Sequence, residues 1–546
     1  MKKYLYFILL TLLFTSFYYV NAQPQNANPK LVVGIVVDQM RYDYLYRFEK
    51  LFGNNGFKKL MNEGTNFTFA HFNYVPTYTA PGHTSIYTGT TPFFHGIISN
   101  DWYDRELRKS VYCTGDNTEK TVGADDKSGE MSPRRLLSTT ISDQLKIETN
   151  NRSKVISISL KDRAAILMGG HFADAAYWYD SKNGNFISST YYMDRLPEWA
   201  QKFNEQKLAD KYLKSEWTLS FPIEKYQQSI PDEASYEQDI FSEGKTSFPH
   251  SFKNVKDSKK YDLLRSTPFA NEIQYWFVKE AIVNENLGKH IDTDFLAISF
   301  CASDFVGHSY GPNSVEVEDL YVKLDNIIAE LLKTLNKQVG KGNYLLFLTA
   351  DHAVAENPVL MAQRKYKVKW FEPKSITDSL KSFTSRKFND EEIIENFSNK
   401  QIFLNYDLIN SKNLDASEIR KAYKQYLVQT FNELAVVYTR NELANQMPGR
   451  NSSNLILNGF NSSRSGDVTF ELQPGLLFGN GKWDASTHGS MYSYDTHVPI
   501  LFYGWGIPKA INDAPVFITD IAATVANLLK ISEPNASIGI PLIKRK

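Results

Sequence analysis

Residues 31–37 read LVVGIVV, a continuous apolar and β-branched run that ends at Asp38. A run that is apolar on both faces suits a strand buried in a parallel sheet, because helices cover both sides of such a strand. The same design recurs at 154–160 (KVISISL), 294–300 (DFLAISF) and 344–349 (YLLFLT), and 498–503 (VPILFY) is a fifth candidate. These runs predict the core of a sheet.

Helical patterns lie between the predicted strands. Apolar residues recur at three- and four-residue steps at Leu320, Leu324, Ile327, Leu331 and Leu335. Asn313 and Glu316 are spaced like a capping box ahead of them, and residues 518–529 form a second amphipathic pattern. Strands that alternate with helices predict an α/β fold, with a mostly parallel central sheet sandwiched by helices. Ligands of such sheets bind outside the carboxyl ends of the strands.

Two stretches interrupt this alternation, at about 175–268 and about 358–481. The first is rich in aromatic residues, lysine and serine, and the second has a helical part followed by a part rich in Gly, Asn and Ser. We interpret both as insertions that cap the active site of a single catalytic domain, residues 23–546, rather than as independent domains.

The first 22 residues are typical of a secretory signal peptide. Two lysines follow Met1, an apolar stretch runs over 4–19, and small residues precede a cleavage site before Gln23. The competing interpretation is a membrane anchor, but a spanning helix needs about 20 apolar residues. No cysteine follows the cleavage site, which argues against a lipoprotein. We therefore expect an exported protein, periplasmic or secreted, with no membrane anchor after cleavage.

The charge balance excludes broad electrostatic attraction as the basis of function. Lys+Arg and Asp+Glu each number 61, so the net charge is zero, and we expect no nucleic acid as a specific partner. The chain is expected to act on small molecules as a monomer. Its two cysteines, Cys113 and Cys301, can pair in an oxidising compartment or remain two isolated buried thiols.

Potential metal ligands follow three of the predicted strands: Asp38, Asp304, His308, Asp351 and His352. Taken singly, an Asp after a strand is usually a helix cap or turn residue, and a lone His is usually structural. The combination favours a metal site, because Asp304 and His308 stand four apart in a Gly-containing loop. Asp351 and His352 are adjacent. Mixed carboxylate and imidazole ligands suit zinc, with manganese, iron or cobalt less favoured.

A candidate nucleophile opens the segment 79–85 (TAPGHTS), which is followed by 88–97 (TGTTPFFHGI) and Asn100. By itself this segment is a helix start with a capping threonine. A threonine hydroxyl becomes a useful nucleophile when a base or a metal lowers its pKa. Two metals about 4 Å apart would activate the attacking group and the leaving group in turn.

These motifs carry a resemblance to a known family. Residues 37–45 (VDQMRYDYL) resemble the first metal motif of the nucleotide pyrophosphatase/phosphodiesterase branch of the alkaline phosphatase superfamily. The Thr79 segment is similar to the nucleophile helix of that branch. Residues 304–308, 351–352 and 486–490 (STHGS) are similar to its remaining metal motifs, in the same chain order, and the resemblance covers about residues 31–542.

The resemblance implies two Zn²⁺ per chain. One zinc would be bound by Asp38, Asp351 and His352, with Thr79 as its nucleophilic ligand. The other would be bound by Asp304, His308 and His488. No motif counterpart makes ligands of His83, His95 or His497, which are therefore expected to be structural or to support the ligands.

A finer assignment rests on Lys161 and Arg163, which resemble the Lys-x-Arg pair of the phosphate-insensitive bacterial alkaline phosphatases of PafA type, which are monoesterases. A monoester dianion has one more charged oxygen than a diester, so cations at this strand end favour monoesters. Asn100 would donate to a further phosphoryl oxygen. The closing segment 494–499 (YDTHVP) also resembles the monoesterase pattern.

The implied activity is hydrolysis of phosphate monoesters to alcohol and inorganic phosphate through a phosphothreonine intermediate at Thr79. The alternative is a phosphodiesterase or nucleotide pyrophosphatase of the same superfamily, for which the aromatic insertions could supply a pocket for the second ester group. A sulfatase is disfavoured because neither cysteine stands in the Cys-x-Pro-x-Arg pattern. A non-enzymatic exported protein that stores metal or mediates adhesion would bind zinc without turnover.

Overall fold

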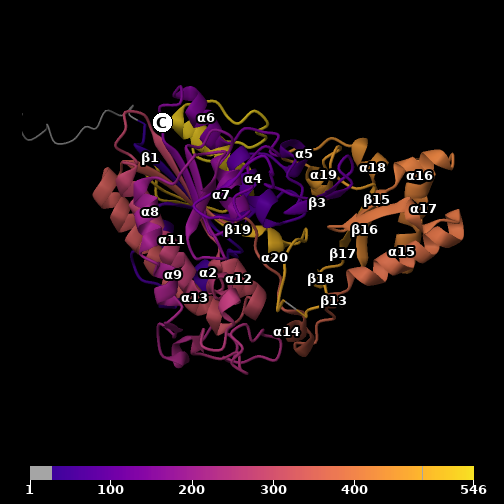
Figure 1. Cartoon of the computed structure of the whole chain (residues 1–546), viewed down its shortest axis with the longest axis horizontal. Coiled ribbons are helices and arrows are strands. Elements are labelled where there is room, and N and C mark those ends of the chain that lie inside the picture. The colour runs from indigo at the N-terminus through magenta and orange to yellow at the C-terminus, as the bar shows by residue number, and fades with distance from the viewer. Residues whose placement is uncertain (1–27, 483, 546) are drawn as a thin grey trace, which may run out of the picture.

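The structure, a computed structural model, describes residues 28–482 and 484–545 (Figure 1). The predicted signal peptide, residues 1–22, lies outside the described residues. Within the described part of the chain, no helix has both the length and the apolar character needed to cross a bilayer.

The central element is an 11-stranded sheet, in the order β20-β2-β19-β12-β1-β11-β6-β7-β8-β5, with β21 also paired to β2. Its strands are β1 (Leu31–Val37), β2 (Thr65–His71), β5 (Thr121–Val122), β6 (Val155–Ser159), β7 (Ala175–Tyr179), β8 (Phe186–Ser189), β11 (Asp294–Phe300), β12 (Tyr344–Thr349), β19 (His497–Gly504), β20 (Ala510–Asn512) and β21 (Val516–Phe517). Among these described strands, β19 and β8 alone run against the others. The predicted mostly parallel α/β sheet is confirmed, and all five predicted strands belong to it.

Strand β1 lies at the middle of the sheet, hydrogen-bonded in parallel to β11 and β12. All seven of its residues are buried, as the apolar run predicts. The glycine within this run has a packing reason. A Cβ atom on Gly34 would lie 2.3 Å from the hydroxyl of Tyr87 and 2.5 Å from the ring of Phe347, so only glycine fits between them.

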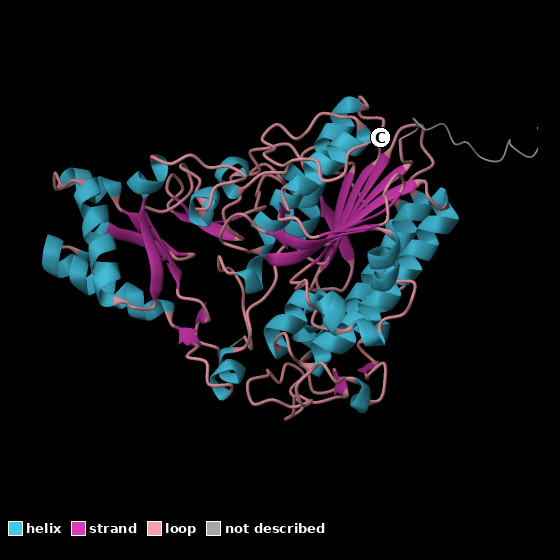
Figure 2. Cartoon of the chain, turned by 180° about the vertical axis from the view of Figure 1, so that it is seen from behind, coloured by secondary structure: helices cyan, strands magenta, loops and turns pink. Residues whose placement is uncertain are grey.

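Helices cover both faces of the sheet, as Figure 2 shows from behind. One layer consists of α4 (Thr79–Thr88), α6 (Ile141–Glu148), α7 (Asp162–Gly169) and α21 (Asp520–Leu529). The other contains α3 (Phe57–Glu63), α8 (Glu198–Glu205), α11 (Pro268–Asn284), α12 (Ala302–Tyr310) and α13 (Val315–Leu335). The predicted capping box of Asn313 and Glu316 is wrong, because Ser314 is the N-cap of α13 and its hydroxyl accepts from the amide of the N3 residue, Val317, at 3.2 Å.

The beginning of the first interruption, from residue 175, includes β7 and β8, which extend the main sheet. We therefore place the start of this insertion after β8. The segment that follows contains α8, α9 (Leu208–Tyr212), the short strands β9 (Glu216–Trp217) and β10 (His250–Ser251), and α10 (Asp257–Leu264). Long irregular connections join these elements and pack on α12 and α13.

The second interruption forms a lobe of its own, drawn in orange at the right of Figure 1. A four-stranded sheet has the order β14 (Ile394–Ser398), β15 (Gln401–Leu404), β17 (Val468–Leu472), β16 (Leu434–Thr439). The helices α15 (Pro373–Phe388), α16 (Tyr406–Ser411) and α17 (Ala416–Thr430) pack on it around a hydrophobic cluster separate from the main core. The lobe returns to the catalytic body through β18 (Leu476–Phe478) and α20 (Ser493–Thr496).

Candidate active site

Sheet topology brings the candidate residues to one edge. Asp38 follows the parallel strand β1 directly, Lys161 and Asp351 stand two residues after the parallel strands β6 and β12, and Asp304 stands four residues after β11. Carboxyl ends of parallel strands meet at the same edge of a sheet. His488 precedes β19, and because β19 is antiparallel to β12, its beginning lies at that same edge.

Thr79 is the first residue of α4 and is 1% exposed. Its hydroxyl has no hydrogen-bond partner among the residues that the structure describes. The helix approaches β12 closely at Gly82, where an added Cβ would lie 2.1 Å from the Asp351 carbonyl oxygen. This glycine therefore lets the first turn of α4, and Thr79 with it, pack against the strand end that carries Asp351.

One compact group of potential metal ligands consists of Asp38, Asp351 and His352, whose ligand atoms all lie within 4.8 Å of one another. All three side chains are fully buried. Oδ1 of Asp38, Oδ2 of Asp351 and Nε2 of His352 have no hydrogen-bond partner within the described part of the chain. Buried polar atoms normally have partners, so three that face one another fit a metal ion.

The three histidines of the site are oriented alike, each with Nδ1 against a backbone carbonyl. Nδ1 of His352 lies 2.9 Å from the Ala353 carbonyl, Nδ1 of His308 lies 2.9 Å from the Ser486 carbonyl, and Nδ1 of His488 lies 2.7 Å from the Thr77 carbonyl. A carbonyl oxygen can only accept, so each Nδ1 carries the proton and donates it. In His352 and His488, Nε2 is left with its lone pair toward the carboxylates, which is the arrangement that metal-binding histidines show. Burial alone would lower the pKa of His308, but Asp304 raises it to about 9, so Nε2 of His308 also carries a proton and faces Asp304 as a donor that a bound cation would displace.

A second group adjoins the first and contains Asp304, His352 and His488 within 4.8 Å. His308, expected here as a ligand, lies nearby, with Nε2 3.3 Å from Oδ1 of Asp304. Asp304 and His308 were expected in a loop, but they lie on helix α12, where a spacing of four places both on one face. The rings of His352 and His488 stack at 3.5 Å between centroids, so the two groups are contiguous.

The buried carboxylates and imidazoles of the site have shifted pKa values. Burial and the neighbouring Asp351 raise the pKa of Asp38 well above its usual value. Burial alone would raise the pKa of Asp304 too, but Lys161 and His308 lower it well below its usual value. Burial lowers the pKa of both His352 and His488, which favours neutral imidazoles. Several buried carboxylates with neutral imidazoles form a donor set that divalent cations complement.

Lys161 lies between the two groups of ligands. Its ammonium is 2.7 Å from Oδ2 of Asp38 and 2.6 Å from Oδ2 of Asp304. Burial alone would lower the pKa of Lys161, but the two carboxylates raise it, so the side chain is cationic. The structure therefore places the Lys161 charge at the centre of the site.

Hydrogen bonds to neighbouring residues fix the side chains of Arg163 and Asn100. The Arg163 guanidinium donates to the hydroxyl of Tyr112 at 3.2 Å, and Tyr112 donates to Asp162 at 2.8 Å. Oδ1 of Asn100 accepts from the Ala80 amide at 2.9 Å, at the beginning of α4. This bond fixes the orientation of the amide. The Asn100 NH₂ group has no partner among the described residues and remains able to donate.

The other histidines have different contacts. His83 bonds the Thr79 carbonyl through Nδ1 and the Ser299 hydroxyl through Nε2, and Nδ1 also lies 3.3 Å from Asp351, so it supports the ligands. His95 bonds Ser85, and His497 bonds the Thr68 carbonyl and stacks on His71.

The two cysteines are separate. Cys113 and Cys301 are both buried and free, which settles the open question of pairing.

Two supporting residues had no role assigned from the sequence. Gln39 links the two ligand groups, since its backbone N–H donates to Asp351 at 3.1 Å and its side-chain NH₂ donates to Asp304 at 2.7 Å. Its place beside Asp38 in the first motif was a usable signal. Tyr112 lies on a hairpin strand, β4 (Lys109–Tyr112), about 50 residues before Arg163, and no local pattern connects the two.

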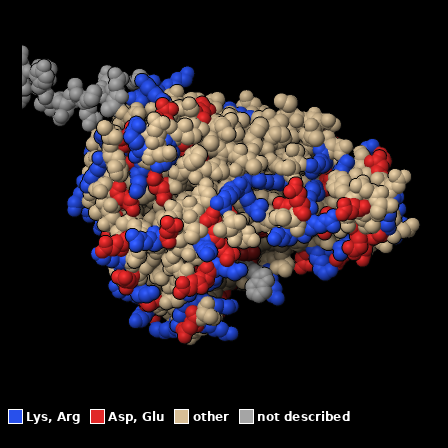
Figure 3. Space-filling model, turned by 45° about the horizontal axis from the view of Figure 1, so that its top comes forward, with Lys and Arg blue, Asp and Glu red and all other residues tan. Residues whose placement is uncertain are grey.

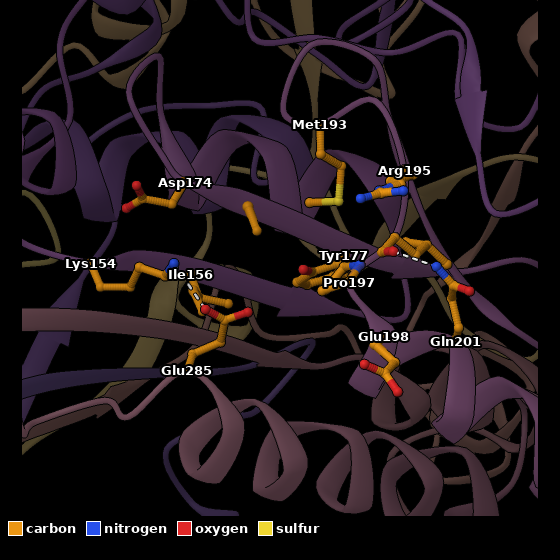
Figure 4. Close-up of a pocket in the computed structure, with 12 residues that line it drawn as sticks. Lys154, Ile156, Asp174, Tyr177, Met193, Arg195, Pro197, Glu198, Gln201 and Glu285 are labelled. Carbon is orange, nitrogen blue, oxygen red and sulfur yellow. Dashed lines mark hydrogen bonds and ion pairs between the residues drawn. The ribbon is translucent and has the colours of Figure 1, made fainter.

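A separate cavity of about 500 Å³ lies at the opposite edge of the sheet (Figure 4). Lys154 and Asp174 line it just before β6 and β7 begin, and Lys154 pairs with Glu285 at 2.8 Å. This cavity therefore takes no part in the candidate site. On the face shown in Figure 3, cationic and anionic side chains are intermixed, in keeping with the zero net charge.

Comparison with known proteins agrees with this geometry. The family described as type I phosphodiesterase / nucleotide pyrophosphatase matches residues 32–495, which include all the candidate ligands above. The chain belongs to this family. Within it, the similarity is to bacterial alkaline phosphatases. PhoV of Synechococcus elongatus is 44% identical over 94% of this chain and 92% of its own length, and PafA of Elizabethkingia meningoseptica is 41% identical over 95% of each.

Solved structures give the same result. A crystal structure of wild-type alkaline phosphatase PafA matches with a TM-score of 0.90, at 40% identity, over 96% of this chain and 99% of that one. A relative from Myroides odoratus, 42% identical over 94% of each chain, bears the name calcium-transporting ATPase. The resemblance to the PafA-type alkaline phosphatases is thus confirmed, together with the α/β fold.

Proposed function

We propose that this protein is an exported phosphate monoesterase that uses Thr79 as a covalent nucleophile at a site for two zinc ions. Family membership and the two alkaline phosphatase relatives support hydrolysis of phosphate monoesters as the activity. The nucleophile, the identity and number of the metals, and export are our own inferences. The observation that carries the proposal is the convergence of unpaired ligand atoms, a buried lysine and the beginning of α4 at one edge of the sheet.

The residues that would hold the metals are those with the unpaired atoms. Asp38, Asp351 and His352 fit one ion. Asp304, His308 and His488 would hold the other, with His352 at the border between them. A donor set of three imidazoles and three carboxylates favours zinc over magnesium or calcium, which prefer oxygen ligands alone. Bound there, the two ions would lower the pKa of the attacking hydroxyl and stabilise the negative charge on the departing oxygen.

The chain's own residues position the phosphoryl group. Thr79 attacks phosphorus through its hydroxyl oxygen, the bond to the ester oxygen breaks, and the alcohol leaves after taking up a proton. Water then cleaves the bond between phosphorus and Thr79, which releases phosphate and restores the hydroxyl. Lys161, Arg163 and the NH₂ group of Asn100 are the donors available to the nonbridging oxygens. This arrangement fits phosphoryl transfer, in which catalysis is mostly positioning and electrostatics.

The preference for monoesters rests on the two cations. A monoester dianion offers more charge to Lys161 and Arg163 than a diester does. A crystallised variant of PafA carries substitutions at a threonine, an asparagine, a lysine and an arginine, the same four residue types that we assign here. The family description also includes phosphodiesterases, so a diesterase is the second candidate.

The experiment is a comparison of three substrates on one purified, zinc-supplemented sample: an aryl phosphate monoester, the corresponding diester and the corresponding sulfate ester. We expect kcat/KM for the monoester to exceed the other two by roughly 100-fold or more, the order that two charge-assisted contacts provide. A diester that is hydrolysed as well as the monoester would contradict the proposal and favour the second candidate.

Metal dependence gives an independent check on the same sample. Prolonged chelation should abolish activity, and zinc should restore it better than magnesium. Elemental analysis that finds fewer than two tightly held transition-metal ions per active chain would contradict the two-metal site.

A further inference from the structure

A lysine of the second insertion reaches into the catalytic body. Lys400 lies in the turn between β14 and β15 and is 5% exposed. Its ammonium bonds Oε2 of Glu471, on β17 of the same lobe, at 2.6 Å, and Glu471 is 4% exposed. The ammonium also donates to the Gly489 carbonyl at 2.8 Å, and Gly489 belongs to the catalytic body. One buried charge therefore joins the lobe to the main domain.

Gly489 follows the candidate ligand His488 directly. Its φ of +111° is one that glycine adopts readily, and a Cβ there would lie 2.3 Å from the ring of Tyr78. Tyr78 is the residue before Thr79, and its ring meets the His488 ring edge-on at 5.7 Å between centroids. The carbonyl that Lys400 holds is thus packed against the residues that flank the nucleophile and the ligand.

The loop that contains His488, Gly489 and Ser490 is also held by hydrogen bonds from residues of the catalytic body. The Thr77 carbonyl accepts from Nδ1 of His488, and the Thr77 hydroxyl donates to the Ser490 carbonyl at 3.0 Å. The Ser490 amide donates to Asp495 at 2.7 Å. Lys400 supplies a further anchor to this loop, and it comes from the insertion.

We propose that Lys400 is a positioning residue for the second metal, because its bond to Gly489 fixes the place of Nε2 of His488. A charge-assisted hydrogen bond to a carbonyl is strong and directional, and burial excludes the water that would otherwise replace it. The lobe is then a structural part of the metal centre as well as a cover over it. The inference rests on the proposed function in one respect, that His488 is a ligand.

The chain offers a matched control for the loss of a buried lysine. Lys146 is 4% exposed, bonds both carboxylate oxygens of Asp174 at 3.0 Å and donates to the Ser153 carbonyl at 2.9 Å. Like Lys400 it bonds a carboxylate and a backbone carbonyl, with a further bond to the Asn151 carbonyl at 3.2 Å, but it lies at the opposite edge of the sheet. Any general cost of removing a buried ammonium is therefore common to both sites.

The test measures metal affinity by chelator competition in two double variants, Lys400→Met with Glu471→Gln and Lys146→Met with Asp174→Asn. Neither variant leaves a buried carboxylate unpaired. We expect the first to hold one of its two zinc ions roughly 10- to 100-fold more weakly than wild type, the range typical when partners behind a metal ligand are lost. The control should retain wild-type affinity for both ions.

A second readout follows the ligand itself. With cobalt in place of zinc, the visible absorption bands of the Lys400 variant should change while those of the control do not, since these bands report ligand geometry. Lys400→Gln, which keeps a hydrogen-bond donor without the charge, is a milder variant that should show the same change to a smaller extent.

Unchanged zinc affinity and unchanged cobalt spectra in the folded Lys400 variants would overturn the inference. Equal weakening in the control would also overturn it, because the effect would then come from the general loss of a buried ion pair. A wild-type chain that holds fewer than two metals would instead contradict the proposed function.

Discussion

Thr79 has the position expected of a nucleophile, buried at the beginning of α4 with a hydroxyl that no described residue engages. We expect Thr79→Ser to keep substantial activity, since it retains a hydroxyl, and Thr79→Ala to lose roughly 10³-fold or more in kcat. Steady-state kinetics with metal content measured in parallel is the check, because Thr79→Ala should still bind zinc. Near-wild-type turnover in Thr79→Ala would point to direct attack by water.

Lys161 and Arg163 should determine the preference for monoesters. Removing either cation should cost monoesters more than diesters, by a selective loss of roughly 10- to 100-fold in kcat/KM, the order of one charge-assisted contact. The measurement uses both substrate classes in Lys161→Ala, Arg163→Ala and the double variant. Lys161 also contacts Asp38 and Asp304, so the metal content of the Lys161→Ala variant must be determined together with its kinetics. Equal losses for both classes would mean that the pair only supports structure.

At the residue scale, the candidate metal-ligating Asp and His side chains could be predicted from the sequence. Asp38, Asp351 and His352 stand within three residues of the ends of buried strands, so their convergence follows from the predicted sheet. Lys161 was expected to bind the nonbridging oxygens of the substrate, and the structure adds that its ammonium bonds the carboxylates of both ligand groups. Contacts of this kind, and that of Tyr112 with Arg163, depend on tertiary packing between distant segments, which no spacing in the sequence encodes.

At the scale of elements, long apolar runs are the most predictable, because a strand buried on both faces must be apolar throughout. Helix α12 was expected to be a loop because Gly307 usually signals one. The structure gives this glycine another reason. A Cβ there would lie 1.8 Å from Oε1 of Gln39, so a larger residue would displace the Gln39 side chain from its bond to Asp304. In a sequence, a glycine that permits a close approach cannot be told from a glycine that belongs to a flexible turn.

The irregular segment of the first insertion carries a pH-sensitive carboxyl group. Burial, followed by the charge of Glu316, raises the pKa of Glu237 to about 8. An unfolded glutamate has a pKa near 4.3, so between these values the unfolded state releases a proton that the folded state keeps. The Glu237 contribution to stability is thus present at acid pH and lost as the pH rises through about 8.

Glu237→Gln removes this ionisation and should stabilise the protein at pH 9 more than at pH 5. Thermal unfolding at both pH values is the measurement, with Glu205→Gln, an exposed glutamate of α8, as the control that should show no such difference. If Glu237→Gln changes the melting temperature equally at both pH values, Glu237 does not titrate in this range.

At the scale of the whole molecule, the catalytic centre is assembled from segments spread over more than 450 residues, from Asp38 to His488. Sheet topology explains this assembly, and the antiparallel direction of β19 is essential to it, because a parallel strand would place His488 at the far edge. The fold class and the order of motifs could be predicted from the sequence. The separate core of the second lobe and its contact with Gly489 could not, since weak periodicity leaves such segments open to several packings.

The central claim is that phosphoryl transfer occurs in two displacements through Thr79. The most direct measurement is the stereochemical course of transfer from a monoester made chiral at phosphorus with oxygen isotopes to an alcohol acceptor. Each in-line displacement inverts phosphorus, so two displacements restore the original configuration. The account predicts retention of configuration in the product ester. Inversion would mean a single direct transfer without a phosphothreonine, and would contradict the account.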